Sequence, residues 1–350
     1  MHATRHLGSL DGLRGVAAIA VVFTHAATFM APLSAPSGSL AVDLFFMLSG
    51  YVLYHAYADR LAADMTAARF MALRMLRLAP LYYIGALLAL MLFAMSPADG
   101  ARTGLADVMA VVALFTMMPS PFPNRYGELF ALNGPRWSLF FELAVNLTMV
   151  GLLRAGLGAR SFALIAFGLA AATIYAIVTR GTIEFGWDRH SFLLGFCRAG
   201  SEFFIGVLLC MVRGPTRMQH WIGYVIPVAV VPVLFLRTVD HPFLIVLAVY
   251  LVFPAIIVAG ARMSAGWSGL NDVLGAISYP LYVIHVPIFG LVAWGLRRRG
   301  MAPADVAPWL GLAVAGMAIG ISWWLAVNFD APLRRTMIGR LMARRRNPAA

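Results

Sequence analysis

Long apolar runs separated by short polar connections make up most of the chain. A helix of about twenty apolar residues crosses the hydrocarbon core of a bilayer. The connections between the runs, such as PLSAPSGS and SPADGARTG, are rich in Pro, Gly and Ser, as loops are. The pattern therefore predicts an all-α protein, a polytopic bundle of transmembrane helices. The apolar segments lie at 9–31, 39–57, 71–95, 105–118, 137–153, 161–178, 191–212, 219–236, 243–261, 274–296 and 304–328.

The positions of the arginines predict the topology of the bundle. Arginines concentrate on the cytoplasmic side of membrane proteins. Segment 105–118 is too short to span, and treating it as a re-entrant or interfacial piece leaves about ten spans with both termini cytoplasmic. The transmembrane domain is then 1–335, followed by a basic cytoplasmic tail, 336–350. The three arginines at 297–299 fall on the extracytoplasmic side and do not fit this topology. The arginines used are Arg5, Arg60, Arg69, Arg74, Arg77, Arg154, Arg160, Arg213, Arg217 and Arg262.

Composition supports this class of protein. Of the 350 residues, 61% are hydrophobic and only 12% are charged, whereas soluble globular chains carry about 25% charged residues. The net charge of +12 is best explained by the arginines that set the membrane topology. An alternative explanation is attraction to the anionic headgroups of the lipid bilayer. Nucleic-acid binding explains the charge poorly because no basic soluble module is present to perform it.

The first apolar segment carries ionisable residues that are costly in hydrocarbon. Arg14 and His25 are eleven positions apart, about three helical turns, so they share one face roughly 16 Å apart. Ionisable residues in a membrane normally face a bundle interior or a wet cavity and mark a site. Histidine is the side chain best suited to move a proton near neutral pH. The alternative is a buried histidine that only hydrogen-bonds a neighbouring helix.

The predicted topology places several more ionisable residues at a depth similar to that of His25. They are Asp43 in the second span, Glu142 in the 137–153 span, and Arg198 with Glu202 in the 191–212 span. Polar residues from several helices at one level favour a functional site. The alternative is a charge-paired network that holds the helices together.

Arg74 and Arg77 lie three positions apart, on one helical face at the predicted cytoplasmic entrance of a span. Together with Arg14 they supply three permanent charges, and the planar guanidinium group suits phosphate oxygens. Arginines that flank a span often do no more than set its orientation. Ser278, Tyr282 and His285 also share a face and either line a substrate path or satisfy one another between helices.

Five blocks of the chain resemble integral-membrane acyltransferase family three, in the order in which that family has them. They are LDGLRGVAAIAVVFTHA, AVDLFFMLSGYVL, RFMALRMLRLAPLYY, RWSLFFELAVN and ISYPLYVIHVPI, which span residues 10 to 288. The histidine of the first helix is essential in that family, and His25 holds its place. The chain departs from the family pattern at Leu143 and Ala144, where acidic and aromatic residues are common, and at Ile284 and Val286, where tryptophans are common.

The resemblance implies an O-acyltransferase of the bacterial inner membrane. The donor is expected to be cytoplasmic acyl-CoA, with acetyl as the acyl group, and the acceptor a hydroxyl of an extracytoplasmic glycan or glycolipid. His25 acts as general base or as a transient acyl carrier. No metal-ligand spacing stands out. The expected catalytic residues are His25, Asp43 and Glu142; the donor-binding residues are Arg14, Arg74 and Arg77; the substrate-binding residues are Trp137, Ser138, Arg198, Tyr282 and His285.

A secondary transporter or flippase with a buried His/Asp/Glu proton relay is the competing interpretation. Transporters of that kind are commonly built from inverted repeats with paired broken helices. The sequence shows no such internal symmetry.

Overall fold

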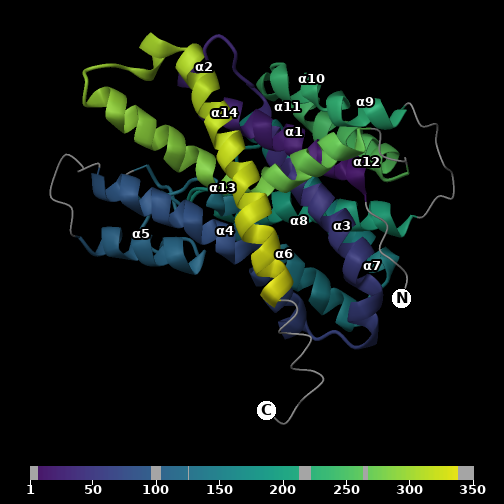
Figure 1. The fold of residues 1–350 in the computed structure, drawn as a ribbon. Helices are drawn as coiled ribbons and strands as arrows, with labels where there is room; N and C mark the ends of the chain where they lie inside the picture. The colour runs from purple at the N-terminus through teal and green to yellow at the C-terminus, as the bar shows by residue number, and fades with distance from the viewer. Residues whose placement is uncertain (1–6, 96–103, 125, 213–221, 263–266, 338–350) are drawn as a thin grey trace.

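The computed structural model describes residues 7–95, 104–124, 126–212, 222–262 and 267–337, and its regular elements within these ranges are helices (Figure 1). An isolated β-bridge joins Glu128 to Asp188 in the loops on either side of α6 and α7. The all-α class is therefore confirmed. Of the predicted basic tail, 336–350, the part after Met337 lies outside the described residues.

Eight helical stretches of the described chain are long and apolar enough to cross a membrane. They contain α3, α4, α6, α7, α8, α11 with α12, α13 and α14. The elements are α1 Gly8–His25, α2 Ala27–Met30, α3 Ala41–Ala63, α4 Ala67–Met95, α5 Leu105–Thr116, α6 Arg136–Arg154, α7 Ala159–Arg180, α8 Phe192–Met211, α9 Ile222–Ala229, α10 Val231–Phe235, α11 Pro242–Leu247, α12 Phe253–Arg262, α13 Ser268–Arg297 and α14 Trp309–Trp324, with a π-helical turn Ala248–Val252 between α11 and α12 and another, Leu325–Asp330, after α14.

Two of the predicted spans are shorter than the rest. Helix α1 has 18 residues. The predicted span 219–236 is broken into α9 and α10, with Pro227 inside α9 and Pro232 in the first turn of α10. Segment 105–118 forms α5, whose 12 residues reach only about 18 Å. It lies beside α4 (Figure 1), as expected for a segment too short to span.

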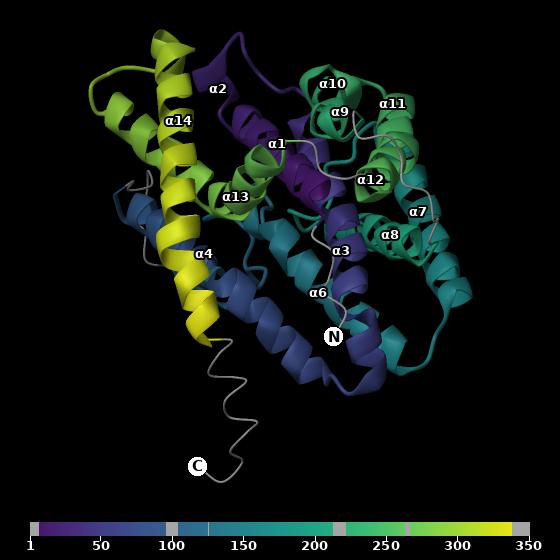
Figure 2. The same cartoon turned by 45° about the vertical axis from the view of Figure 1, so that its right-hand side comes forward.

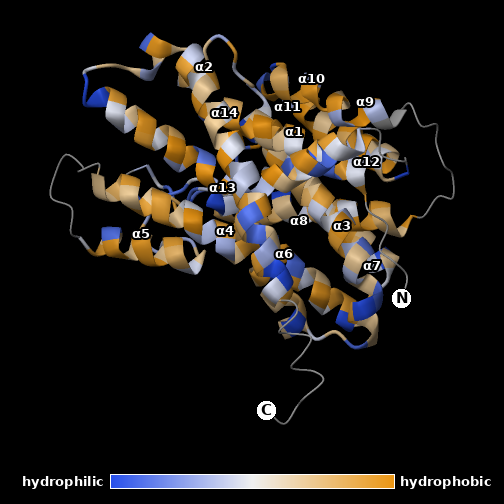
Figure 3. Cartoon of the chain, viewed as in Figure 1, coloured by the Kyte–Doolittle hydropathy of each residue, from blue (hydrophilic) through white to orange (hydrophobic). Residues whose placement is uncertain are grey.

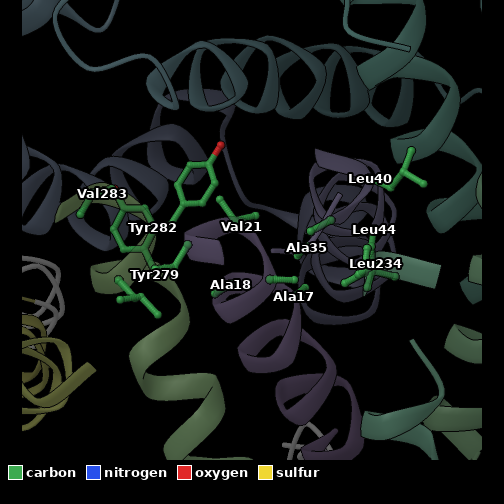
Figure 4. Packing of buried hydrophobic residues seen from close by; sticks show 14 of the residues in the cluster. Ala17, Ala18, Val21, Ala35, Leu40, Leu44, Leu234, Tyr279, Tyr282 and Val283 are labelled. Atoms are coloured by element: carbon green, nitrogen blue, oxygen red, sulfur yellow. The ribbon is translucent and has the colours of Figure 1, made fainter. Parts of the chain in front are cut away.

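Helix α1 lies inside the bundle, packed most extensively against α13 and flanked by α3 and α9 (Figure 2). Glycines allow the close approach: a Cβ on Gly15 would lie 2.3 Å from the Cβ of Leu274. Figure 4 shows Ala17, Ala18 and Val21 of α1 between the α13 residues Tyr279, Tyr282 and Val283 on one side and Ala35, Leu40, Leu44 and Leu234 on the other. The ionisable residues of α1 are therefore held among neighbouring helices.

Helices α3 and α8 form a second close pair. A Cβ on Gly50 would lie 1.9 Å from the carbonyl oxygen of Phe203, and a Cβ on Gly206 would lie 2.0 Å from that of Met47. The backbones touch because both positions lack a side chain. This contact brings the polar residues of the two helices within bonding distance.

The outer surface of the bundle is apolar. Large hydrophobic side chains are exposed along α7, among them Leu164, Phe167 and Tyr175. Hydrophobic residues also predominate along α9, α10 and α11 (Figure 3). Exposed apolar area on this scale suits contact with lipid chains and is foreign to a soluble surface.

Candidate active site

Two cavities inside the bundle share a wall. The first, with about 60 Å³ open to the centre of a water molecule, is called here the arginine cavity after Arg14; the second, with about 40 Å³, is the histidine cavity. Val42 and Tyr282 line both. The polar side chains of the arginine cavity are Arg14, Ser49, Ser138, Glu142, Ser278, Tyr279 and Tyr282; those of the histidine cavity are Thr24, His25, Ser39, Trp137, Glu184, Arg198 and Tyr282.

His25 is the last residue of α1 and is exposed in the wall of the histidine cavity. Its Nδ1 lies 3.1 Å from the carbonyl oxygen of Val21 and 3.0 Å from Nε2 of His285. His285 itself is fully buried in α13, and its Nδ1 lies 2.9 Å from the carbonyl oxygen of Leu281. The structure thus pairs the two predicted histidines, which are 260 residues apart in the sequence.

Asp43 and Arg198 form a bidentate ion pair between α3 and α8. Nε of Arg198 donates to one carboxylate oxygen at 2.7 Å and Nη2 donates to the other at 2.8 Å, and both side chains are 0% exposed. The guanidinium also lies over the ring of Trp137, 5.2 Å from its centroid. Asp43 is therefore bound to Arg198, and Arg198 forms part of the wall that faces His25.

Glu142 lies on the arginine side of the shared wall. Nη2 of Arg74 donates a short hydrogen bond to its Oε1, and the Ser49 hydroxyl donates to the same oxygen at 2.9 Å. The topology predicted Glu142 at the level of His25 and Arg74 at the cytoplasmic entrance of its span. The bond between them shows that this separation is wrong. Helix α4 begins at Ala67, four residues before the predicted span, so Arg74 lies about 10 Å along it, within reach of a carboxylate on α6.

The three arginines predicted to bind the donor gather with one further arginine. Arg77 is within electrostatic range of Arg14, Arg74 and Arg334. Asp330 lies between two of them: its Oδ2 is 3.5 Å from Nη1 of Arg77 and 2.5 Å from Nη2 of Arg334. Four arginines against the carboxylates of Glu142 and Asp330 leave a net charge of +2, which favours an anionic ligand.

Arg334 and Asp330 were absent from the sequence prediction. They lie beyond the last predicted span, 304–328, where the chain continues helically through a π-helical turn to Met337. The signal available in the sequence was an aspartate followed four residues later by an arginine, a spacing that places both on one helical face.

Tyr282 anchors the wall that separates the two cavities. Its hydroxyl lies 2.7 Å from the Ser138 hydroxyl and donates to the carbonyl oxygen of Pro135 at 2.9 Å. Tyr282 and Ser138 are both buried. The predicted face of Ser278, Tyr282 and His285 therefore contributes to both cavities: Ser278 to the first, Tyr282 to the shared wall, and His285 to the support of His25.

Glu184 is the third site residue that the sequence prediction missed. It lies in the loop between α7 and α8, which the prediction treated only as a connection, and it lines the histidine cavity together with His25 and Arg198. Within the described ranges, no group of three or more His, Cys, Asp or Glu side chains is placed to hold a metal ion. Cys197 and Cys210 are free thiols.

The helices and the two cavities define a class of protein: a polytopic membrane protein with a polar pocket lined by Arg14 on one side of a shared wall and an accessible histidine on the other. The family described as "Acyltransferase domain" matches residues 7–327, and the chain belongs to this acyltransferase 3 family. It is therefore a membrane acyltransferase that takes an acyl donor and an acceptor, and this membership decides against the transporter interpretation.

The chain is also similar to a curated protein. "Protein 2 in picA locus" of Rhizobium radiobacter is 39% identical over 148 residues, which cover 39% of this chain and 77% of that protein. No solved structure matches the chain.

Proposed function

We propose that the protein transfers an acyl group, with acetyl the expected one, from acyl-CoA in the arginine cavity to a hydroxyl of a glycan or glycolipid in the histidine cavity. The observation that carries the proposal is the shared wall: Val42 and Tyr282 line both cavities. A thioester that passes Tyr282 comes to His25 while its nucleotide stays among the arginines.

The arginine cavity suits the donor. Coenzyme A carries several phosphate groups, and guanidinium groups bind phosphate oxygens with paired hydrogen bonds. Arg14 lines the cavity, and Arg77 lies within electrostatic range of it. Arg77 and Arg334 share the single carboxylate of Asp330, whereas Arg74 has the carboxylate of Glu142 to itself. The roughly 16 Å between Arg14 and His25 along α1 is comparable to the length of the pantetheine arm. The arginine side then faces the cytoplasm of a bacterial cell, in line with the distribution of positive charge.

The histidine cavity suits a polyhydroxylated acceptor. Trp137 presents an apolar ring with a polar edge, and the Glu184 carboxylate accepts hydrogen bonds from hydroxyl groups. His25 takes the proton of the attacking hydroxyl, and the oxygen adds to the thioester carbonyl. The C–S bond breaks, and the proton passes from His25 to the departing sulfur, which leaves as the coenzyme A thiol. Arg198 stabilises the negative charge that develops on the carbonyl oxygen.

The test uses purified protein in liposomes with labelled acetyl-CoA and extracytoplasmic glycolipids as acceptors. His25→Ala should lose transfer by at least about a hundredfold, the usual contribution of a positioned general base, whereas His190→Ala, an exposed loop histidine, should retain it. Mass spectrometry of surface glycans from cells with and without the protein should show a difference of one acyl group. Full activity of His25→Ala would end the proposed role.

A further inference from the structure

The two histidines make three contacts that together fix where their protons lie. His285 Nδ1 faces the carbonyl oxygen of Leu281, and His25 Nδ1 faces that of Val21. The third contact joins His285 Nε2 to His25 Nδ1 at 3.0 Å. A carbonyl oxygen only accepts hydrogen bonds, so each Nδ1 must carry a proton for these contacts to be favourable.

With those protons placed, the contact between the rings is also satisfied. A neutral His285 protonated on Nδ1 has a bare Nε2, which accepts the hydrogen bond from His25 Nδ1–H. Two neutral rings thus complete all three contacts, His25 sharing its proton between His285 and Val21. In the opposite tautomer both Nδ1 lone pairs would face carbonyl oxygens, and two bonds would be lost, one of them fully buried. Nε2 of His25 is left bare on the ring that lines the histidine cavity.

We propose that His285 is a positioning residue that holds His25 in the tautomer whose Nε2 accepts the proton of the acceptor hydroxyl. The proposal rests on the function proposed above. The logic is that of catalytic triads, in which an aspartate fixes the tautomer of the active histidine. Here a neutral imidazole takes that place, and the carbonyl of Leu281 fixes the imidazole in turn.

The surroundings of His285 explain why a neutral group serves here. His285 is 0% exposed within a membrane-spanning helix, where an unpaired carboxylate would be costly. The two carboxylates predicted to be catalytic are both bonded to arginines, Asp43 to Arg198 and Glu142 to Arg74. The imidazole supplies an acceptor at the same place without adding charge.

A matched pair of amide variants tests the proposal. The terminal atoms of glutamine reach the level of a histidine Nε2, so His285→Gln retains an acceptor for His25. Those of asparagine reach only the level of Nδ1, so His285→Asn retains the bond to Leu281 and loses the one to His25. We expect kcat of His285→Gln to stay within about threefold of wild type and that of His285→Asn to fall by about tenfold or more, one hydrogen bond's worth. The KM for acetyl-CoA should be unchanged in both, because the donor phosphates bind elsewhere.

The outcomes separate this proposal from the one on which it rests. If wild-type protein transfers no acyl group, or His25→Ala remains active, the proposed function fails. If those controls behave and the two amide variants are equally active, the positioning role is overturned. Equal loss of activity in both, or failure of both to fold as judged by gel filtration in detergent, also overturns it, because the imidazole would then be needed for packing and not for its acceptor atom.

Discussion

The buried ion pair between Asp43 and Arg198 allows a direct test of whether Asp43 stabilises the fold or takes part in catalysis. Replacing Asp43 by asparagine preserves the shape of the side chain and removes its charge. Arg198 is then left as a fully buried cation; its Nη1 already has no hydrogen-bond partner. Breaking a buried pair in this way costs about 3–5 kcal/mol.

The size of the loss depends on which carboxylates remain near Arg198. Glu202 lies one helical turn away on α8 and is fully buried, with its carboxyl group beside that of Asp43. Glu184 lies in the wall of the histidine cavity but is exposed to solvent. Glu202 is therefore the group able to replace part of the lost attraction, and we expect the measured loss to fall near the lower end of the range.

The assay is thermal unfolding in detergent followed by gel filtration, with acetyl transfer measured on the same samples. Asp43→Asn should lower Tm by several degrees, whereas Asp59→Asn, an exposed aspartate on the same helix, should not. The double variant Asp43→Asn/Arg198→Gln removes both charges and should recover most of the stability. Its kcat should stay low, because Arg198 lines the cavity at His25.

The opposite result would refute the reasoning. If Asp43→Asn unfolds at the temperature of wild type and loses transfer completely, the pair contributes nothing measurable to stability, and Asp43 acts in the chemistry. A double variant less stable than Asp43→Asn alone would contradict the view that the unpaired cation causes the loss.

Two further predictions concern the donor site and the close contact of α3 with α8. Arg334→Gln should raise the KM for acetyl-CoA about tenfold with little change in kcat. Its neighbour Arg335 is exposed, and Arg335→Gln should leave both KM and kcat unchanged. Equal KM values for the two variants would show that Arg334 does not belong to the donor site. Gly50→Ala should destabilise the protein by about 3 kcal/mol or more, because its Cβ would meet the backbone of Phe203 at 1.9 Å. Gly168→Ala on α7 faces open space and should be tolerated. Similar unfolding temperatures for the two variants would show that the α3–α8 contact adjusts freely.

The sequence by itself determined the class of the protein and most of its helices. Runs of about twenty apolar residues have few alternatives to spanning a bilayer, and the structure has helices in each predicted segment. It also identified His25, Arg14 and Arg77 as residues of interest, because an ionisable side chain within such a run is costly and so has a reason to be there. The number of residues in segment 105–118 likewise predicted that α5 is too short to span the bilayer.

Only the tertiary structure decided which of these residues meet. Hydropathy gives the position of a residue along its helix and the face it occupies, but lipid chains are as apolar as leucine, so hydropathy does not encode which helices become neighbours. Pairing is set by glycine contacts such as Gly50 on Phe203, and by hydrogen bonds between distant segments. For that reason Glu142, predicted at the level of His25, bonds to Arg74, and His25 has His285 as its partner.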